Sequence, residues 1–292
     1  MSRLSVEMST DTLAPYRNQT IALLTQHGKE RVIAPALEPA LGCRLRVVDG
    51  YDTDQLGTFT RDVPRTGSQL SAARRKAQLA IELSGLPYGL GSEGTFGPDP
   101  MVGSLSWNVE VLVFVDAERD LEVVGEAHGP GLHQHVWTST WADVATLARR
   151  VGFPSQQLVM GNRLNGQPPL TKGLDSWAKL EAAFEDFHAQ STSGAVWVET
   201  DLRAHAHPTR MARIGEAATD LANRLQQHCP ACGCPGFWPV ERVAGLTCRD
   251  CGYPTRLTRA WVHGCQRCHH RETRIVASDR LAPPERCDMC NP

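Results

Sequence analysis

The cysteines of this chain are concentrated near its C-terminus and arranged in pairs. Nine of the ten cysteines in 292 residues lie between positions 229 and 292. A turn with two residues between two cysteines presents two thiolates to one metal ion, and tetrahedral Zn²⁺ takes four ligands. Four such pairs therefore predict two four-cysteine structural zinc sites. Their ligands would be Cys229 and Cys232, Cys248 and Cys251, Cys265 and Cys268, and Cys287 and Cys290.

Two ways of joining these pairs agree with their spacing. We favour joining neighbours, the first pair with the second and the third with the fourth, which gives two zinc ribbons. The alternative is a cross-brace, which joins the first pair with the third and the second with the fourth. Gly233 and Gly252 follow the first two pairs directly, where a left-handed backbone is useful. Cys234 is left over, and a redox thiol centre is the less favoured interpretation because it needs only one pair.

The same C-terminal segment is rich in arginine. From residue 227 onward it carries nine Arg and six Asp or Glu, a formal charge of +3. Each four-thiolate zinc site would contribute −2, which changes the balance to −1. A scaffold or protein-contact role is therefore favoured over nucleic-acid binding, because the segment as a whole is not basic. A local stripe that binds nucleic acid is the alternative, with Trp261 stacking on a base. Its members would be Arg256, Arg259, Arg267, Arg271 and Arg274.

A second candidate site lies near the N-terminus, between a predicted strand and a predicted helix. A glycine there lets the backbone approach a ligand, and the first helical turn offers free N–H groups. A lysine adds a positive charge that suits a phosphate. Taken alone, the pattern also fits an ordinary turn. The residues are Thr25, Gln26, His27, Gly28 and Lys29.

A third polar segment, residues 199–210, reads ETDLRAHAHPTR and leads from a predicted strand into a predicted helix. Ligands of α/β domains usually bind at such places. Asp201 and His205 could act as base and orienting group, or share a metal ion, and Arg203 and Arg210 could hold phosphate oxygens. The alternative is local helix capping by one of the carboxylates, with Arg210 as its ion-pair partner.

Strands and helices alternate in the residues before the cysteines, which predicts an α/β domain. We expect a mixed sheet with flanking helices over residues 20–227, a flexible leader over 1–19 and a double zinc-ribbon module over 228–292. Pro35 and Pro39 weaken the first helix, since proline interrupts or ends helices. Predicted strands cover residues 20–25, 44–48, 88–92, 108–115, 121–126, 157–160 and 195–199. Predicted helices cover residues 29–41, 67–84, 141–151, 176–190 and 208–227.

The composition is that of an ordinary globular protein, with 41% hydrophobic and 21% charged residues. No run approaches the roughly 20 apolar residues of a membrane span, so no membrane contact is expected. The N-terminus lacks the pattern of a secretory signal. We therefore expect a cytoplasmic protein, in which clustered cysteines bind metal more often than they form disulfides. The net charge of −2 gives no reason to expect a polyanionic partner for the whole chain.

The order of the N-terminal motifs resembles that of the inosine/xanthosine triphosphate pyrophosphatase superfamily. There a T-x-N-P-x-K loop is followed by an A-x-x-K/R-A-x-x-A helix and by a short strand that ends in an acidic residue beside glycine. Residues 25–29, 73–80 and 88–94 follow this order, within a resemblance that covers about residues 20–126. It implies an inosine-triphosphatase-like fold with a triphosphate held by residues 25–29. It also implies that Lys76 lies on the central helix and that Glu93 binds Mg²⁺ or activates water.

The chain departs from this pattern at two places. Gln26 or His27 replaces the asparagine of the loop. The carboxylate that should bind metal just before the central helix is replaced by polar residues, so a two-carboxylate Mg²⁺ site is not assured. Asp52 and Asp54 could substitute for it. The residues that stand before the helix are Ser68, Gln69 and Ser71.

The whole chain also resembles an uncharacterised bacterial family with the same HGKE, GTFT, SEGTFG and ETDxRAH elements and with terminal cysteine pairs. That resemblance implies no activity.

Two functions follow from these observations. The first is a Mg²⁺-dependent hydrolase of nucleoside triphosphates or related nucleotides. The second is a non-catalytic protein that binds a nucleotide or nucleic acid and contacts a partner through its zinc module. In the first, the catalytic residues would be Glu93, Asp201 and His205, and the phosphates would be bound by residues 25–29, Lys76, Arg203 and Arg210.

Overall fold

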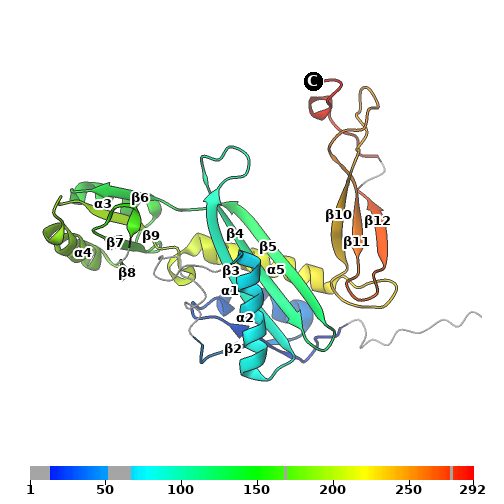
Figure 1. Ribbon diagram of the computed structural model, residues 1–292, viewed down its shortest axis with the longest axis horizontal. Helices are drawn as coiled ribbons and strands as arrows, with labels where there is room; N and C mark the ends of the chain where they lie inside the picture. The colour runs from blue at the N-terminus through cyan, green and yellow to red at the C-terminus, as the bar shows by residue number, and fades with distance from the viewer. Residues whose placement is uncertain (1–13, 52–66, 168–169, 277–278) are drawn as a thin grey trace, which may run out of the picture. The chain divides into compact units, whose positions relative to one another are not determined.

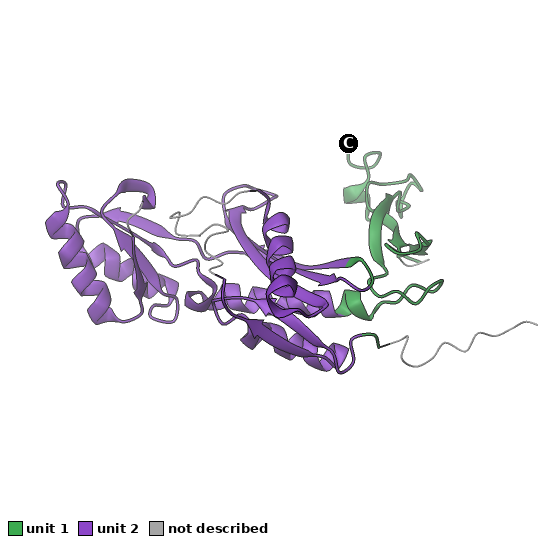
Figure 2. Ribbon diagram, turned by 60° about the horizontal axis from the view of Figure 1, so that its bottom comes forward, with its two compact units in different colours: residues 1–15, 119–121, 223–292 green, residues 16–118, 122–222 purple. Residues whose placement is uncertain are grey.

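The computed structural model describes residues 14–51, 67–167, 170–276 and 279–292. Asp52, Asp54 and the GTFT motif at 57–60 lie outside the described residues, as do the first 13 residues of the predicted leader. Two compact units are present (Figure 2). One comprises residues 16–118 and 122–222, and the other comprises residues 223–292 with residues 14, 15 and 119–121.

The first unit contains a five-stranded mixed sheet with the strand order β2-β1-β3-β4-β5 (Figure 1). Strand β1 is parallel to β2 and β3, and β3 is antiparallel to β4. The predicted mixed sheet is thus present, although β3 runs six residues beyond its predicted end at Ser92. The elements are β1 (Thr20–Leu24), α1 (Glu30–Leu41), β2 (Arg44–Val48), α2 (Gln69–Ser84), β3 (Tyr88–Pro98), β4 (Ser106–Asp116) and β5 (Leu121–Pro130).

Helix α1 is continuous through both of its prolines. Pro35 and Pro39 are four residues apart and exposed, while Ile33, Leu37 and Leu41 are buried. The carbonyls that lose a partner to proline therefore lie on the side of the helix that faces water. The apolar face keeps its packing against the sheet, which outweighs the weak local propensity.

Helix α2 packs very closely on β3. A Cβ at Gly89 or Gly91 would collide with the backbone carbonyls of Ala77 and Ala73 on α2. Glycine at these alternate positions lets the helix approach the strand backbone. On the same face, Val111 and Val113 of β4 pack against the alanines of α2.

A second sheet, also in the first unit, has the order β6-β9-β7-β8, with antiparallel neighbours. It has its own core, formed with α3 and α4. The segment predicted as one α/β domain thus contains two sheets, and β6 and β8 were not predicted. The elements are β6 (His135–Thr138), α3 (Trp141–Val151), β7 (Leu158–Gly161), β8 (Thr171–Leu174), α4 (Trp177–Gln190) and β9 (Val196–Thr200).

The chain leaves this second sheet through a short 3₁₀ turn, η4 (Ala204–Ala206), and enters α5 (Pro208–Gln226). Helix α5 lies across the five-stranded sheet on the face opposite α2 (Figure 1). The alternation of β4 agrees with this placement, because Glu110 contacts α5 while its neighbour Val111 packs with α2.

Tyr16 belongs to the core of the first unit rather than to a flexible leader. Its side chain is 1% exposed and donates a hydrogen bond of 3.1 Å to the Asp116 carboxylate. Its ring centroid lies 5.0 Å from that of Phe114 and 5.5 Å from that of Tyr88. The predicted leader of residues 1–19 therefore does not extend to Tyr16.

The second unit is built on a three-stranded antiparallel sheet, β10 (Trp238–Ala244), β11 (Thr258–Gly264) and β12 (Arg271–Ile275). The strands follow one another as a meander. Within the described part of the chain, no helix combines the length and the apolar character that crossing a membrane requires.

Candidate functional site

The eight paired cysteines form two tetrads. One contains Cys229, Cys232, Cys265 and Cys268, and the other contains Cys248, Cys251, Cys287 and Cys290, with all four sulfurs of a tetrad within 4.8 Å of one another. Sγ–Sγ separations of 3.6 Å (Cys229–Cys268) and 3.9 Å (Cys248–Cys290) are far longer than a disulfide of about 2.05 Å. They match the roughly 3.8 Å between sulfurs at zinc–sulfur distances of about 2.3 Å. Each tetrad could bind a metal ion, and its donor set fits Zn²⁺.

The pairing that we favoured from the sequence is wrong, because the tetrads join the first pair with the third and the second with the fourth. The cause is the β10–β11–β12 meander. Each strand carries the chain to the opposite end of the sheet, so successive cysteine pairs lie at alternating ends. Neighbouring pairs are thereby kept apart, and alternate pairs meet.

All four cysteine turns share one backbone hydrogen bond, which the residue after the second cysteine donates to the carbonyl of the first. Its length is 2.8 Å for Gly233, 3.0 Å for Gly252, 3.1 Å for His269 and 2.9 Å for Asn291. Gly233 and Gly252 have φ of 72° and 74°, which confirms the expected use of glycine. His269 adopts the same left-handed conformation at φ 59°.

Backbone N–H groups favour thiolates in both tetrads. They lower the pKa of Cys248 and of Cys268 to about 7. In contrast, burial raises the pKa of Cys232 to about 12, and hydrogen bonding to Cys251 raises that of Cys290 to about 12. Four thiolates side by side therefore need a cation, which is what a tetrahedral metal ion supplies.

Two cysteines stand outside the tetrads. Cys234 and Cys43 are buried, and burial raises the pKa of each to about 11. Cys234 is thus spare, as predicted, and both thiols are poor nucleophiles.

The HGKE loop leaves the carboxyl end of β1, beyond which β3 continues paired with β4. Gly28 takes a left-handed conformation with φ 66°, and the Arg31 guanidinium lies over it. Lys29 is the N-cap residue of α1 and points inward, with only 5% of the residue exposed. Its ammonium donates to the carbonyl and the hydroxyl of Ser92, both at 3.3 Å. A buried cation is therefore held by neutral oxygens.

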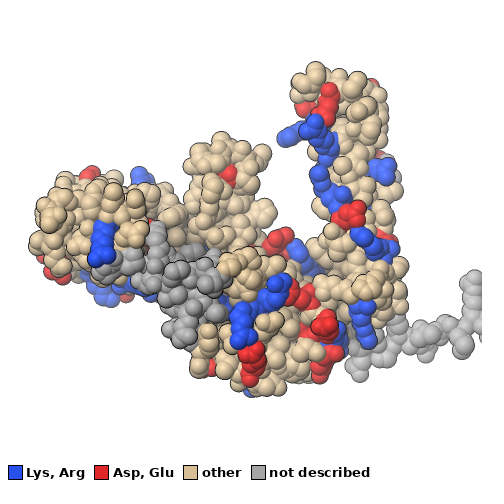
Figure 3. Space-filling model, in the orientation of Figure 1, with Lys and Arg blue, Asp and Glu red and all other residues tan. Residues whose placement is uncertain are grey.

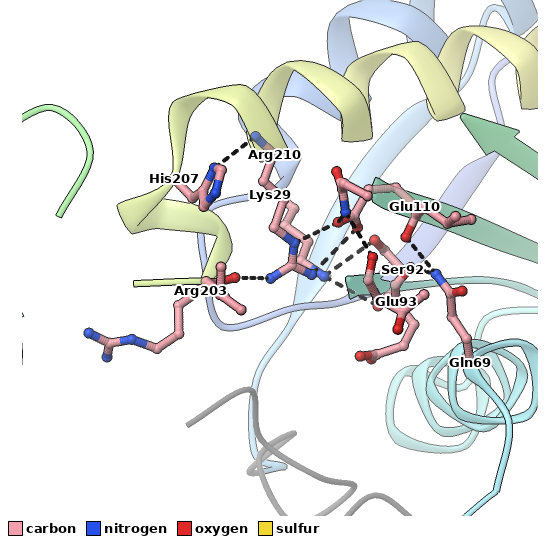
Figure 4. Close-up of polar contacts among 12 residues, drawn as sticks. Lys29, Gln69, Ser92, Glu93, Glu110, Arg203, His207 and Arg210 are labelled. Carbon is pink, nitrogen blue, oxygen red and sulfur yellow. Dashed lines mark hydrogen bonds and ion pairs between the residues drawn. The ribbon is translucent and has the colours of Figure 1, made fainter. Parts of the chain in front are cut away.

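Charged side chains surround Lys29 in the interior (Figure 4). The Arg210 guanidinium of α5 and the Glu110 carboxylate of β4 form a buried ion pair at 2.6 Å, in which both side chains are at most 2% exposed. Lys76 pairs with Glu93. This charge cluster contains three cations, including Lys29, and two carboxylates. When Lys29 is protonated, the cluster carries one excess positive charge.

Arg210 is also fixed from the segment before α5. It donates a hydrogen bond of 2.6 Å to the Leu202 carbonyl, and its amide donates to His207 Nδ1 at 3.1 Å. On the other side, Asn108 donates to the Glu110 carboxylate at 3.0 Å. The ETDLRAH segment and the five-stranded sheet are thereby connected through a single guanidinium.

Glu93 lies within β3 and not after it, so it is not the strand-end carboxylate that we expected. Its side chain faces α2, where it pairs with Lys76, and the Gln69 amide donates to its backbone carbonyl at 2.9 Å. Glu110, which is opposite Gly94 on β4, faces α5 instead. The two carboxylates therefore point to opposite faces of the sheet and do not converge on one ion.

Asp201 forms a local structure with Arg203 and does not contact His205 through any described hydrogen bond or ion pair. Its buried carboxylate accepts hydrogen bonds from the Arg203 backbone and guanidinium, the shortest at 2.6 Å. The Arg203 side chain points away from the charge cluster (Figure 4). The predicted base and orienter pair of Asp201 and His205 is therefore not formed among the described contacts of Asp201.

His205 meets the HGKE loop instead. Its Nδ1 lies 3.2 Å from Nδ1 of His27. The two rings border a pocket of about 510 Å³. None of the described residues that line it carries a carboxylate. The lining comprises Gln26, His27, Gly28, Arg31, His205, Pro208 and Met211.

The pKa values of two groups report a positive field beside this pocket. Burial lowers the pKa of His27 to about 3, with further lowering by repulsion from Lys29, His205, Arg210 and Arg203. Burial, together with repulsion from Arg210 and Lys76, lowers the pKa of Lys29 to about 7. A bound anion would raise both pKa values, because it favours the protonated form of each group.

Sequence reasoning missed several members of this site. Arg31 stands two residues after Lys29, on the first turn of α1, and Ser92 lies in β3. Glu110 and Asn108 interrupt an apolar strand at positions i and i+2, which places both on one face. That interruption was a readable signal for a buried polar cluster.

Among the described residues, no group of three or more His, Cys, Asp or Glu side chains other than the tetrads could hold a metal ion. The two carboxylates of the cluster are each paired with a cation. These residues therefore do not fit a Mg²⁺ site.

A family model described as "Domain of unknown function (DUF6671)" matches residues 76–292. The chain belongs to this family. The matched part of this DUF6671 protein contains both tetrads, Lys76, Glu93 and the ETDLRAH segment, whereas the HGKE loop precedes it. No curated protein and no solved structure matches the chain. Membership of DUF6671 brings no activity, and the pyrophosphatase resemblance stays a prediction.

Proposed function

We propose that the first unit binds a nucleotide or another phosphorylated small molecule in the pocket beside the HGKE loop. Of the two functions predicted from the sequence, this is the non-catalytic one. The observation that carries it is the pocket bordered by His27, Arg31 and His205, without a lining carboxylate among the described residues, beside the buried cation Lys29.

The charge arrangement supports an anionic ligand. Arg31 and the backbone of Gly28 border the pocket directly, while Lys29 and Arg210 act from the interior. A pocket of about 510 Å³ is within the ordinary range for small-molecule sites. The positive end of the α1 dipole also lies at this loop and adds to the attraction for a phosphate.

The hydrolase prediction gains less support. Its carboxylates, Glu93 and Asp201, are held in ion pairs with Lys76 and Arg203. Because the described residues do not form a Mg²⁺ site, no step of hydrolysis can be derived from them.

We also propose that both tetrads hold Zn²⁺ as structural ions. A four-cysteine site has no open position for chemistry. A sheet as small as β10–β12 gains much of its stability from such ions.

Calorimetric titration of the full chain with a panel of nucleoside mono-, di- and triphosphates tests the binding proposal. Arg31→Gln should weaken binding about tenfold, the effect of losing one charge-assisted contact of roughly 1.4 kcal/mol. Lys29→Met should also weaken binding, because it removes a positive charge that acts on the pocket from the interior. Matched controls are Lys179→Met and Arg75→Gln, because both cations lie in exposed ion pairs on other helices. The controls should bind as the unmodified protein does.

Phosphate and pyrophosphate release should be measured in the same samples with added Mg²⁺. Turnover that Glu93→Gln abolishes would restore the hydrolase function. If no phosphorylated compound binds, or if Lys29→Met and Lys179→Met behave alike, the binding proposal is wrong.

A further inference from the structure

The sheet of the second unit carries one aromatic residue between two arginines. In the strand register, Trp261 of β11 is directly opposite Arg242 of β10 and Arg274 of β12. Residues directly opposite one another project from the same face of a sheet. The three side chains, which we call the Arg-Trp-Arg row, therefore run across the middle of the sheet.

The row lies on an exposed and positively charged face. Trp261 is 38% exposed. Glu272, which is opposite His263, is the carboxylate among the strand residues on this face, so the two arginines of the row leave an excess of positive charge there. The other face holds a neutral ion pair, Arg271 with Glu241. Figure 3 shows basic side chains gathered along one side of this unit.

The two arginines of the row are held in place by neighbouring groups and keep guanidinium N–H groups for a ligand. The Arg274 guanidinium lies 5.4 Å from the centre of the Phe237 ring. Its hydrogen bond to Glu272 uses Nε, which leaves both Nη groups for other contacts. Arg242 donates through one Nη to the Arg256 carbonyl at 3.3 Å. Such positioning lowers the entropy lost when a ligand binds.

We propose that the Arg-Trp-Arg row binds single-stranded nucleic acid. Trp261 would stack on one base, and Arg242 and Arg274 would contact the phosphates on either side. Neighbouring strands are about 4.8 Å apart, so the two flanking arginines lie close beside the stacked base. A single strand exposes the faces of its bases, whereas a duplex covers them, which favours the single strand.

The net charge of the C-terminal segment does not oppose this proposal. Its negative contribution would come from the thiolates of the tetrads, which lie at the two ends of the sheet. Trp261 is at the centre of β11, between them. Local charge on the face, and not the sum over the segment, decides the attraction for phosphates. The proposal is independent of the nucleotide pocket.

Fluorescence anisotropy tests whether the Arg-Trp-Arg row binds single strands. The full zinc-loaded chain is titrated into labelled 20-nucleotide oligouridylate and oligothymidylate. Trp261→Leu should weaken binding about tenfold, since stacking of one base on an aromatic ring is worth roughly 1–3 kcal/mol. Trp261→Phe keeps an aromatic face and should retain most of the affinity. Arg242→Gln and Arg274→Gln should weaken binding and each reduce the salt dependence by about one phosphate contact.

Arg271→Gln is the matched control, because it removes the same charge from the opposite face of the same sheet. It should bind as the unmodified protein does, and zinc content measured on every variant separates binding from folding. The proposal is overturned if neither oligonucleotide binds at 50 mM salt, if Arg271→Gln is as weak as Arg242→Gln, or if Trp261→Leu binds normally. Lys29→Met should bind both oligonucleotides unchanged, and loss of binding there would place the strand in the nucleotide pocket instead. A difference between the two oligonucleotides identifies RNA or DNA as the preferred strand.

Discussion

Lys29 places an ammonium group in the interior against neutral oxygens. Burial and the neighbouring Arg210 and Lys76 lower its pKa from 10.5 to about 7. The cation is thus poised to lose its proton near neutral pH. A buried lysine with a lowered pKa is typical of a functional site. Here it supports an anion-binding site beside the HGKE loop.

This pKa predicts how stability depends on pH. Between pH 7 and 10.5 the unfolded chain keeps the Lys29 proton that the folded protein releases, so the contribution of Lys29 to the free energy of unfolding rises with pH. The rise amounts to at most about 1.4 kcal/mol per pH unit. Urea unfolding of the unmodified protein and of Lys29→Met should therefore diverge across this range, with the unmodified protein gaining. If the stabilities of Lys29→Met and the unmodified protein run parallel with pH, the lowered pKa is contradicted. Lys179→Met is the control, and its stability should run parallel to that of the unmodified protein.

The buried pair of Glu110 and Arg210 predicts a large effect of a single change. Glu110→Gln should lower the free energy of unfolding by about 3–5 kcal/mol, because it leaves the Arg210 guanidinium buried without a charged partner. Glu82→Gln is the control, since Glu82 pairs with Arg75 at the surface with 55% of its side chain exposed. Its effect should be about 0–1 kcal/mol. Equal losses in urea titrations of the two variants would refute the buried pairing.

At the scale of elements, close contact between α2 and β3 fixes the position of the candidate site. Gly89 and Gly91 bring the helix against the strand backbone, so Lys76 on α2 reaches Glu93 on β3. Among the described residues, β1 pairs with β3 only at the start of β3, and the Ser92 carbonyl farther along that strand accepts a hydrogen bond from the Lys29 ammonium instead. Packing between elements therefore places the cations.

Gly91→Ala should lower the free energy of unfolding by about 1–3 kcal/mol, because the new methyl group would collide with the Ala73 carbonyl. Gly97 lies on the same strand, and nothing is within 4 Å of its Cβ position. Gly97→Ala should therefore leave the urea midpoint nearly unchanged. A similar midpoint for both variants would show that α2 does not rest on the strand as described.

At the scale of the whole molecule, two units of different construction share one chain. The first has apolar cores under its sheets. The second has a three-stranded sheet with a cysteine tetrad at each end. Metal removal should therefore unfold residues 229–290 and leave the first unit folded, as limited proteolysis after chelation would show. Complete digestion of the whole chain would contradict this independence.

The zinc content of double cysteine variants tests which cysteine pairs share a metal ion. Changing Cys229 and Cys265 together to serine affects one tetrad, so one zinc per chain should remain. Changing Cys229 and Cys248 together affects both tetrads, so both ions should be lost. Elemental analysis of the two purified variants distinguishes the possibilities, because the sequential pairing would give the reverse result.

The sequence by itself determined which cysteines form the candidate metal sites, the spare Cys234 and most helices and strands. Cysteine spacing and hydrophobic periodicity are local properties, which neighbouring residues express without help from the rest of the chain. The helix predicted over residues 29–41 is present as α1, where packing of Ile33 and Leu37 offsets the two prolines that weakened the prediction.

Only the tertiary structure decided which groups meet. Glu110 and Arg210 are 100 residues apart and pair because β4 and α5 cross. His205 meets His27 rather than Asp201, and the meander joins alternate cysteine pairs. Such contacts depend on strand order and on helix placement, which many distant apolar contacts determine together. No short pattern in the sequence encodes them.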